Sequence, residues 1–236
     1  MNIGIIGNGF VGKATQVLEC ENVTIFCYDK IPEMCSPIGT TLKDLVEKCQ
    51  IIFVSVPTPM DKNGECYLNI LESVVHELQS LAYTGFIVIR STIPVGTSKK
   101  LECYFMPEFS TETNYLQDFV NNKCWIFGLL ENDSPERVLL FQKLIRQLFS
   151  FSHESKKILH NTIEFVSTEE AEMIKYFKNT FLANNPKFRT NDDILLLCNK
   201  KKLVRNVYVK KNVIGRNLFP ATGIAKFSSS TLKKYL

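Results

Sequence analysis

The chain has 236 residues, of which 45% are hydrophobic and 22% charged, with 28 Lys and Arg against 24 Asp and Glu. This apolar content is enough for a packed core, which excludes a disordered chain and a collagen-like fibre. No apolar run approaches the roughly 18 residues of a membrane helix, and the N-terminus does not resemble a secretory leader, so we expect a soluble, cytoplasmic protein.

The hydrophobic pattern alternates between the periods of strands and helices over residues 1–183. In chain order, it predicts a strand over Asn2–Ile6, a helix over Phe10–Leu18, a strand over Val23–Tyr28, a helix over Leu42–Cys49, a strand over Ile51–Val56, a helix over Leu68–Leu81, strands over Phe86–Ile89, Cys103–Met106 and Cys124–Leu129, and a helix over Pro135–Phe149. Continuous apolar strands separated by helices are typical of a parallel sheet covered on both faces. We therefore expect an α/β fold with a doubly wound, Rossmann-like parallel sheet; another α/β layering is the alternative.

The charge distribution changes near residue 184. From Asn184 to Leu236 there are twelve Lys and Arg against two Asp, a net charge of +10, which leaves −6 for residues 1–183. Such a break marks a boundary. The basic runs of this tail have few aromatic residues among them and match no nucleic-acid-binding motif, so we do not expect nucleic acid as a partner.

The eight cysteines form no CxxC pair and have no His partner at metal-ligand spacing. Scattered cysteines of this kind are usually reduced core residues, so the sequence predicts neither a disulfide framework nor a metal site.

A glycine-rich segment lies directly between the first predicted strand and the first predicted helix. It has the pattern G-x-G-x-x-G and consists of Gly7, Asn8, Gly9, Phe10, Val11 and Gly12. The first glycine permits a tight turn, the second lets a diphosphate approach the backbone, and the third lets helix and strand pack closely. Asp29 ends the second strand, where its carboxylate can accept hydrogen bonds from both ribose hydroxyls and would repel a 2′-phosphate. The pattern therefore predicts binding of NAD rather than NADP.

Four further motifs resemble those of the UDP-glucose/GDP-mannose dehydrogenase family. They are Val56-Pro57-Thr58-Pro59, the Ser91–Thr97 string Ser-Thr-Ile-Pro-Val-Gly-Thr, Met106-Pro107-Glu108-Phe109, and the Ala171–Asn179 string Ala-Glu-Met-Ile-Lys-Tyr-Phe-Lys-Asn. Their order and spacing are similar to the family's, and the resemblance covers nearly all of residues 1–183. It implies an NAD-binding Rossmann-like domain over residues 1–165, the start of a central helix over 166–183, and a tail of uncertain structure over 184–236.

The resemblance also implies roles for individual residues. Members of this family oxidise the C6 hydroxyl of a nucleotide sugar to a carboxylate with two NAD⁺, passing through a thioester on a cysteine. Glu108 matches the acid/base position, Lys175 the residue that stabilises charge on the sugar oxygen, and Asn179 its neighbour one helical turn later. Positions that contact the cofactor or an ordered water are matched by Val56, Pro57, Thr58, Ser91, Thr92 and Glu112. UDP-glucose is the expected substrate, and a homodimer is left open.

The resemblance stops after Ala183. The family's Gly-Gly-x-Cys-Phe-Pro-Lys-Asp motif, which carries the nucleophilic cysteine, has no counterpart, and Cys198 lies in an apolar run that does not match it. We therefore interpret the sequence as a truncated UDP-glucose 6-dehydrogenase, with out-of-frame translation of the tail as one explanation. The alternatives are a catalytically inactive NAD-binding remnant or a subunit that lends its half-site to a partner. Outside the family, another NAD-dependent hydroxyacid dehydrogenase is the runner-up.

Overall fold

A computed structural model of the chain describes residues 1–62 and 64–184, with side chains up to Tyr176. Its strands are β1 (Asn2–Ile6), β2 (Thr24–Tyr28), β3 (Ile51–Val54), β4 (Phe86–Ile89), β5 (Tyr104–Phe105), β6 (Trp125–Leu129) and β7 (Ile163–Ser167). Its helices are α1 (Phe10–Gln16), α2 (Leu42–Lys48), α3 (Asn69–Ser80), α4 (Thr97–Lys100), α5 (Tyr115–Val120), α6 (Pro135–Glu154) and α7 (Thr168–Asn184), with a 3₁₀ turn over Pro32–Met34.

The seven strands form one sheet in the order β2-β1-β3-β4-β5-β6-β7. Strands β2, β1, β3, β4 and β5 are parallel, so all five end at the same edge of the sheet. The sixth strand runs antiparallel to the fifth, through the pair Phe105 and Gly128, and β7 is parallel to β6. The chain reverses its winding direction between β1 and β3, and such a switch point is where open α/β sheets bind ligands.

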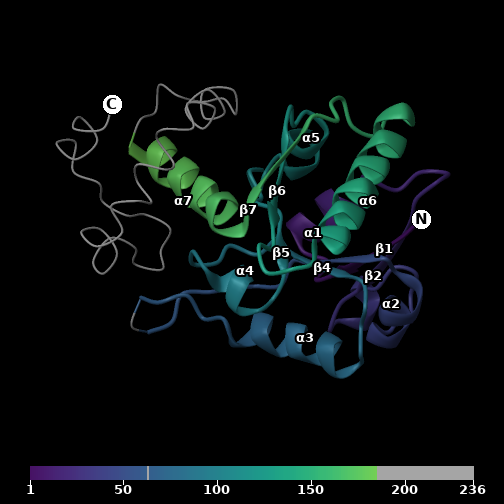
Figure 1. Ribbon diagram of the computed structural model, residues 1–236, viewed down its shortest axis with the longest axis horizontal. Coiled ribbons are helices and arrows are strands. Elements are labelled where there is room, and N and C mark those ends of the chain that lie inside the picture. Colours follow the sequence, from purple (N-terminus) through teal and green to yellow (C-terminus); the bar gives the residue numbers. More distant parts are fainter. Residues whose placement is uncertain (63, 185–236) are drawn as a thin grey trace.

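Both faces of the sheet are covered, because side chains alternate along each strand. On one face, Ile3 and Ile5 of β1 and their neighbours pack with α1, α5 and α6. On the other, Ile6, Ile52 and Ile89 pack with α2, α3, α4 and α7. Figure 1 shows α5 and α6 on one side of the sheet and α2 and α3 on the other. This layering confirms the predicted doubly wound α/β fold.

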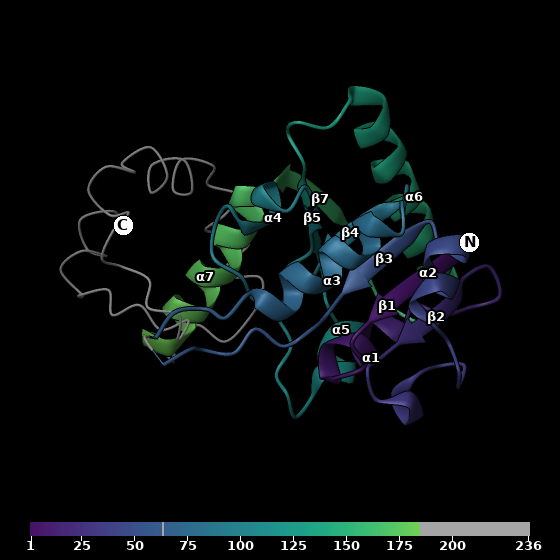
Figure 2. The same ribbon diagram turned by 90° about the horizontal axis from the view of Figure 1, so that it is seen from below.

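The antiparallel step at β6 determines where α7 runs. Because β7 is parallel to β6, it ends at the opposite edge of the sheet from β1, and α7 then turns back. A helix rises about 1.5 Å per residue, so seven residues bring the chain roughly 10 Å back toward the edge where β1 ends. The helix packs on β5 and β6 and lies beside α4 (Figure 2). An added Cβ on Gly128 would lie 2.8 Å from the Cα of Thr168, so α7 and the sheet approach closely there.

Several predicted elements match the structure and others were missed. The strands Asn2–Ile6 and Phe86–Ile89 have the predicted bounds, while α4, α5 and β7 were not predicted. The predicted domain boundary after residue 165 falls within β7. Apart from Asn184, the predicted basic tail lies outside the described residues, as does Cys198.

Within the described part of the chain, no helix combines the length and apolar character needed to cross a bilayer. The seven cysteines found there are free thiols.

Candidate functional site

The glycine turn lies at the edge where the parallel strands end. Gly7 has a φ of +91°, and an added Cβ would lie 2.6 Å from the carbonyl oxygen of Ser55, so the turn passes directly over the end of β3. At Gly12, an added Cβ would lie 2.0 Å from the carbonyl oxygen of Gly7. At Gly9, it would meet no heavy atom within 4 Å. The first and third glycines are therefore required by close contacts within the protein, and the second leaves open space.

That open space suits a diphosphate. Gly9 is the N-cap of α1, whose first turn contains no acidic residue and receives no hydrogen bond from a capping side chain. The amide end of a helix attracts anions through its N–H groups and the helix dipole. Phe10 and Val11 form the first turn of this helix, and Phe10 is 37% exposed beside Tyr115 of α5, with the ring centroids 6.2 Å apart.

Asp29 lies beside the glycine turn, at the end of β2. Its Oδ2 accepts the backbone N–H of Asn8 at 2.7 Å, and its Oδ1 accepts the N–H of Ile31 at 3.0 Å. The Asn8 side chain is itself held, because its Nδ2 donates to Met34 O at 2.5 Å and its Oδ1 accepts from Gln16 at 2.7 Å. These contacts place a carboxylate next to the turn.

The segments that follow β3 and β4 are linked side by side. The hydroxyl of Ser91 donates to the carbonyl oxygen of Val56 at 2.6 Å, and that of Thr58 donates to the carbonyl oxygen of Thr92 at 2.7 Å. Pro57, between the two bonded positions, is exposed, as is Thr92. Two motifs that are far apart in the sequence are thus hydrogen-bonded to each other and form one wall of the candidate site.

A buried ion pair begins next to these segments, because Arg90 directly precedes Ser91. Arg90, at the end of β4, is 2% exposed and donates to the carboxylate of Glu108 and to the hydroxyl of Thr15. Glu108 is 6% exposed, and its Oε1 also accepts the N–H groups of Phe109 at 2.7 Å and Ser110 at 2.6 Å. Burial alone would raise the pKa of Glu108, but Arg90, the Ser110 contacts and Lys175 together hold it below its ordinary value. Glu108 is therefore ionised.

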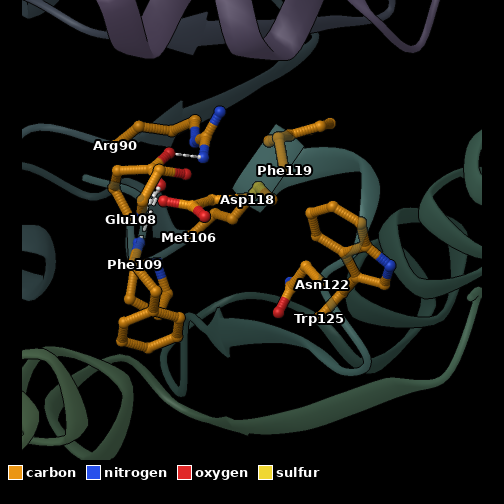
Figure 3. A pocket seen from close by; sticks show the side chains of 10 residues that line it. Arg90, Met106, Glu108, Phe109, Asp118, Phe119, Asn122 and Trp125 are labelled. Carbon is orange, nitrogen blue, oxygen red and sulfur yellow. Dashed lines mark hydrogen bonds and ion pairs between the residues drawn. The ribbon is translucent and has the colours of Figure 1, made fainter. Parts of the chain in front are cut away.

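The ion pair also borders a pocket, shown in Figure 3. Arg90 and Glu108 lie on one side of it, and the rings of Phe119 and Trp125 on the other. The residues that line this pocket are Arg90, Met106, Pro107, Glu108, Phe109, Ser110, Asp118, Phe119, Asn122 and Trp125.

Lys175, on α7, contacts the loop that carries Glu108. Its Nζ donates to the backbone carbonyl of Glu108 and lies 5.9 Å from the centroid of the Phe109 ring. Burial lowers the pKa of Lys175 to about 8, with Glu108 opposing and Arg90 adding to this effect. Glu108 and Lys175, which are 67 residues apart in the sequence, are thus brought together. Glu112 is exposed in the loop before α5, and the side chain of Asn179 lies outside the described residues.

The loop after β4 is fixed to α7 by Glu172. This side chain is fully buried, and its oxygens accept the N–H groups of Gly96 at 2.5 Å and Ser98 at 2.8 Å. Gly96 has a φ of +92°, which suits glycine and exposes these N–H groups at the start of α4. Burial raises the pKa of Glu172, although the backbone contacts oppose that effect.

Comparison with known families agrees with this geometry. Residues 36–149 match the sequence model of the UDP-glucose/GDP-mannose dehydrogenase family, NAD binding domain. Over this part of the chain, which is just under half of it, the described domain is similar to the NAD-binding domain of this family. Its cofactor is NAD, and the glycine turn with its open space at Gly9 fits that group.

Curated relatives and solved structures point the same way. The chain is 30% identical over 165 residues to the uncharacterized protein MJ1054 of Methanocaldococcus jannaschii, which covers 63% of this chain and 17% of that protein. It is 27% identical over 234 residues to UDP-glucose 6-dehydrogenase TuaD of Bacillus subtilis, which covers 84% of this chain and 49% of that protein. The chain therefore spans half or less of the length of these two relatives.

Among solved structures, a GDP-mannose dehydrogenase from Pseudomonas aeruginosa matches 78% of this chain and 50% of its own, with a TM-score of 0.61 and 23% identity. A UDP-glucose dehydrogenase from Pyrobaculum islandicum has the same TM-score at 20% identity. At these identities the likeness shows the fold alone.

Arg90, Thr15 and Glu172 were not singled out from the sequence. A charged residue directly after the apolar strand Phe86–Ile89 was the available signal for Arg90. Glu172 stood within a family motif, but only the fold reveals that it accepts hydrogen bonds from the loop after β4.

Proposed function

We propose that this chain provides the NAD-binding part of a nucleotide-sugar 6-dehydrogenase that acts on UDP-glucose. The observation that carries the proposal is the contact between Lys175 and Glu108 at the sheet edge that also bears the glycine turn. A group that stabilises negative charge on a sugar oxygen must lie beside the nicotinamide end of the cofactor, and this arrangement supplies one. The relative TuaD carries the name UDP-glucose 6-dehydrogenase, which supports the choice of substrate.

We assign each residue a role according to its position in the site. The turn Gly7–Gly12 and the start of α1 hold the diphosphate, and the carboxylate of Asp29 accepts hydrogen bonds from the hydroxyls of a ribose. Val56, Thr58, Ser91 and Thr92 form the wall beside the cofactor. NAD supplies the hydride acceptor when bound. We assign charge stabilisation to Lys175, assisted by Asn179, and a contact to cofactor or water to Glu112.

Glu108 takes part only as an anion in this proposal. A carboxylate with a lowered pKa accepts a proton more readily than it donates one, so the acid role is disfavoured at neutral pH. Both of its oxygens already accept hydrogen bonds. These three contacts leave about one of the four acceptor sites of the carboxylate for a further hydrogen bond.

Two measurements test the proposal. Calorimetric titration should give a defined heat with NAD⁺ and a weaker response with NADP⁺, because Asp29 repels a 2′-phosphate. The protein is then mixed with NAD⁺ and UDP-glucose, and formation of NADH is followed by its absorbance. GDP-mannose serves as the matched substrate control, and equal turnover with both sugars would overturn the choice of UDP-glucose.

An NAD-binding chain without turnover is the second candidate, and the cysteines favour it. The nucleophile of such a reaction is a thiolate, which needs a lowered pKa and access. Burial instead raises the pKa of five described thiols, those of Cys27, Cys49, Cys66, Cys103 and Cys124. NAD⁺ binding with no NADH formed from UDP-glucose would support this candidate, or a subunit whose partner brings the cysteine. The predicted homodimer and cytoplasmic location stay predictions.

A further inference from the structure

Arg90 is 2% exposed, and its contacts join three separate elements. One guanidinium nitrogen donates to Thr15 of α1, and another to the carboxylate of Glu108 in the loop after β5. The guanidinium carbon Cζ of Arg90 lies 5.4 Å from the centroid of the Phe119 ring of α5. Each partner fixes a different side of the planar group, so Arg90 is held in a single orientation.

These contacts form a continuous chain from the helix behind the glycine turn to Lys175. The hydroxyl of Thr15 donates to the carbonyl oxygen of Val11 at 2.9 Å and accepts from Arg90. Arg90 donates to the Glu108 carboxylate, which is also bound by two backbone N–H groups of its own loop. The carbonyl of the same Glu108 then accepts the hydrogen bond of Lys175.

The contacts in this series differ in strength, and the difference shows which residue holds the others in place. A buried carboxylate that loses its ion-pair partner costs about 3–5 kcal/mol, so the loop at Glu108 stays in this position only while Arg90 is present. Lys175, by contrast, contributes a single hydrogen bond to a backbone carbonyl. The loop therefore places the lysine, and the arginine places the loop.

We propose that Arg90 is a positioning residue, which acts through Glu108 to hold the ammonium group of Lys175 against the loop after β5. The proposal rests on the proposed function in that Lys175 is taken as the group that faces the substrate. The position itself is testable without any substrate, because the charged groups that act on Lys175 are Glu108 from the loop after β5 and Arg90 from the end of β4.

The test measures the proton affinity of Lys175 in the full-length protein. Competitive labelling with acetic anhydride over a range of pH, with the labelled peptide quantified by mass spectrometry, reports the pKa of this amine. In the unaltered protein it should be about 8. Arg90→Met and Glu108→Gln both break the link that holds the loop, so Lys175 should enter water and its pKa should rise toward its ordinary 10.5 in both variants.

The direction of the change in Glu108→Gln separates positioning from a purely electrostatic effect. If Lys175 stayed in place in this variant, loss of the attracting carboxylate would lower its pKa below about 8. That outcome would overturn the proposal, as would an unchanged pKa in both variants. Arg90→Lys keeps the charge and should restore a value near that of the unaltered protein.

Arg137 provides the matched control. It also combines an ion pair, with Asp133 at 3.0 Å, backbone carbonyl contacts to Thr84 and Gly85, and an aromatic ring, that of Phe86 at 4.5 Å. Arg137→Met should lower the melting temperature and leave the Lys175 pKa unchanged; a shift there equal to that of Arg90→Met would overturn the proposal.

A second variant covers the case in which Arg90→Met does not fold, and a separate titration tests the proposed function. If Arg90→Met does not fold, the Arg90→Met/Glu108→Gln double variant removes both buried charges together, which avoids an unpaired charge. With both neighbours gone, their opposing electrostatic effects cancel, so a Lys175 that kept its position would keep a pKa near 8. The proposal expects release of the lysine and a pKa that rises toward 10.5, and a value near 8 would overturn it. NAD⁺ titration of the unaltered protein is the independent test of the proposed function, and its failure would leave these pKa results intact.

Discussion

Two glycines of the cofactor turn allow one methyl group to be placed in opposite environments. In Gly12→Ala the new Cβ would lie 2.0 Å from the carbonyl oxygen of Gly7, a backbone atom, so the turn and α1 must separate by about 1 Å to reach 3.0 Å. In Gly9→Ala the new Cβ would meet no heavy atom within 4 Å, and the φ of −70° suits any residue. The two variants therefore separate folding from binding.

The expected magnitudes differ accordingly. Forced overlap with a backbone atom lies at the upper end of overpacking, so Gly12→Ala should lower the free energy of unfolding by about 3 kcal/mol or more. For a domain of this size, that corresponds to a fall in melting temperature of roughly 6–12 °C. Gly9→Ala changes only an N-cap glycine, which costs at most about 1 kcal/mol. Its methyl group fills the space for the diphosphate, so NAD⁺ affinity should fall at least about tenfold.

Thermal unfolding followed by circular dichroism measures the first effect, and calorimetric titration with NAD⁺ at a temperature well below unfolding measures the second. Gly12→Ala should lose both stability and binding, whereas Gly9→Ala should lose binding alone. A Gly9→Ala protein that bound NAD⁺ as tightly as the unaltered protein would refute the placement of the diphosphate over Gly9. A Gly12→Ala protein with an unchanged melting temperature would show that the turn relaxes freely.

Three further predictions concern the charged residues. Asp29→Asn removes the charge that repels a 2′-phosphate, so the preference for NAD⁺ over NADP⁺ should shrink in paired titrations; an undiminished preference would contradict the role of Asp29. Glu172→Ala leaves the N–H groups of Gly96 and Ser98 without their acceptor, and urea unfolding should show a loss of about 2–3 kcal/mol, whereas an unchanged midpoint would argue against this anchor. The folded-state pKa of Lys175, about 8, lies below its ordinary 10.5, so the native state binds fewer protons between these values and stability attributable to Lys175 rises with pH through that window. The difference in unfolding free energy between the unaltered protein and Lys175→Met should therefore grow from pH 8 to 10.5, and a flat difference would contradict the buried position of the lysine.

The sequence predicted those strands that consist of a continuous run of apolar residues. Strand β4 is buried at every position, and its bounds were predicted correctly. Strand β7 was missed because it lies at the edge of the sheet, is only partly buried, and contains the exposed Glu164. Helices α4 and α5 have four and six residues, too few to show a helical period. The antiparallel pairing of β5 with β6 depends on a single pair of residues and leaves no sequence signal.

The same distinction applies to the site. The glycine turn was predictable because its requirements are local: a positive φ at Gly7, close packing at Gly12 and open space at Gly9. The role of Arg90 was not, because its partners are 75 and 18 residues away and an isolated arginine after a strand is compatible with a solvated charge. Only the parallel arrangement of β1, β4 and β5 brings the two partners to the same guanidinium.

The position of Lys175 follows from residues other than the lysine itself. Glu172, three residues earlier on α7, anchors the helix to the loop after β4, and Gly128 allows the start of the helix to approach the sheet. With both contacts made, the following helical turn must face the loop that holds Glu108. A longer side chain at Gly128 would displace the whole helix, whereas a substitution of Lys175 would remove only its terminal hydrogen bond. The packing of α7 therefore sets where the backbone of Lys175 lies, and the loop at Glu108 sets where its ammonium group is held.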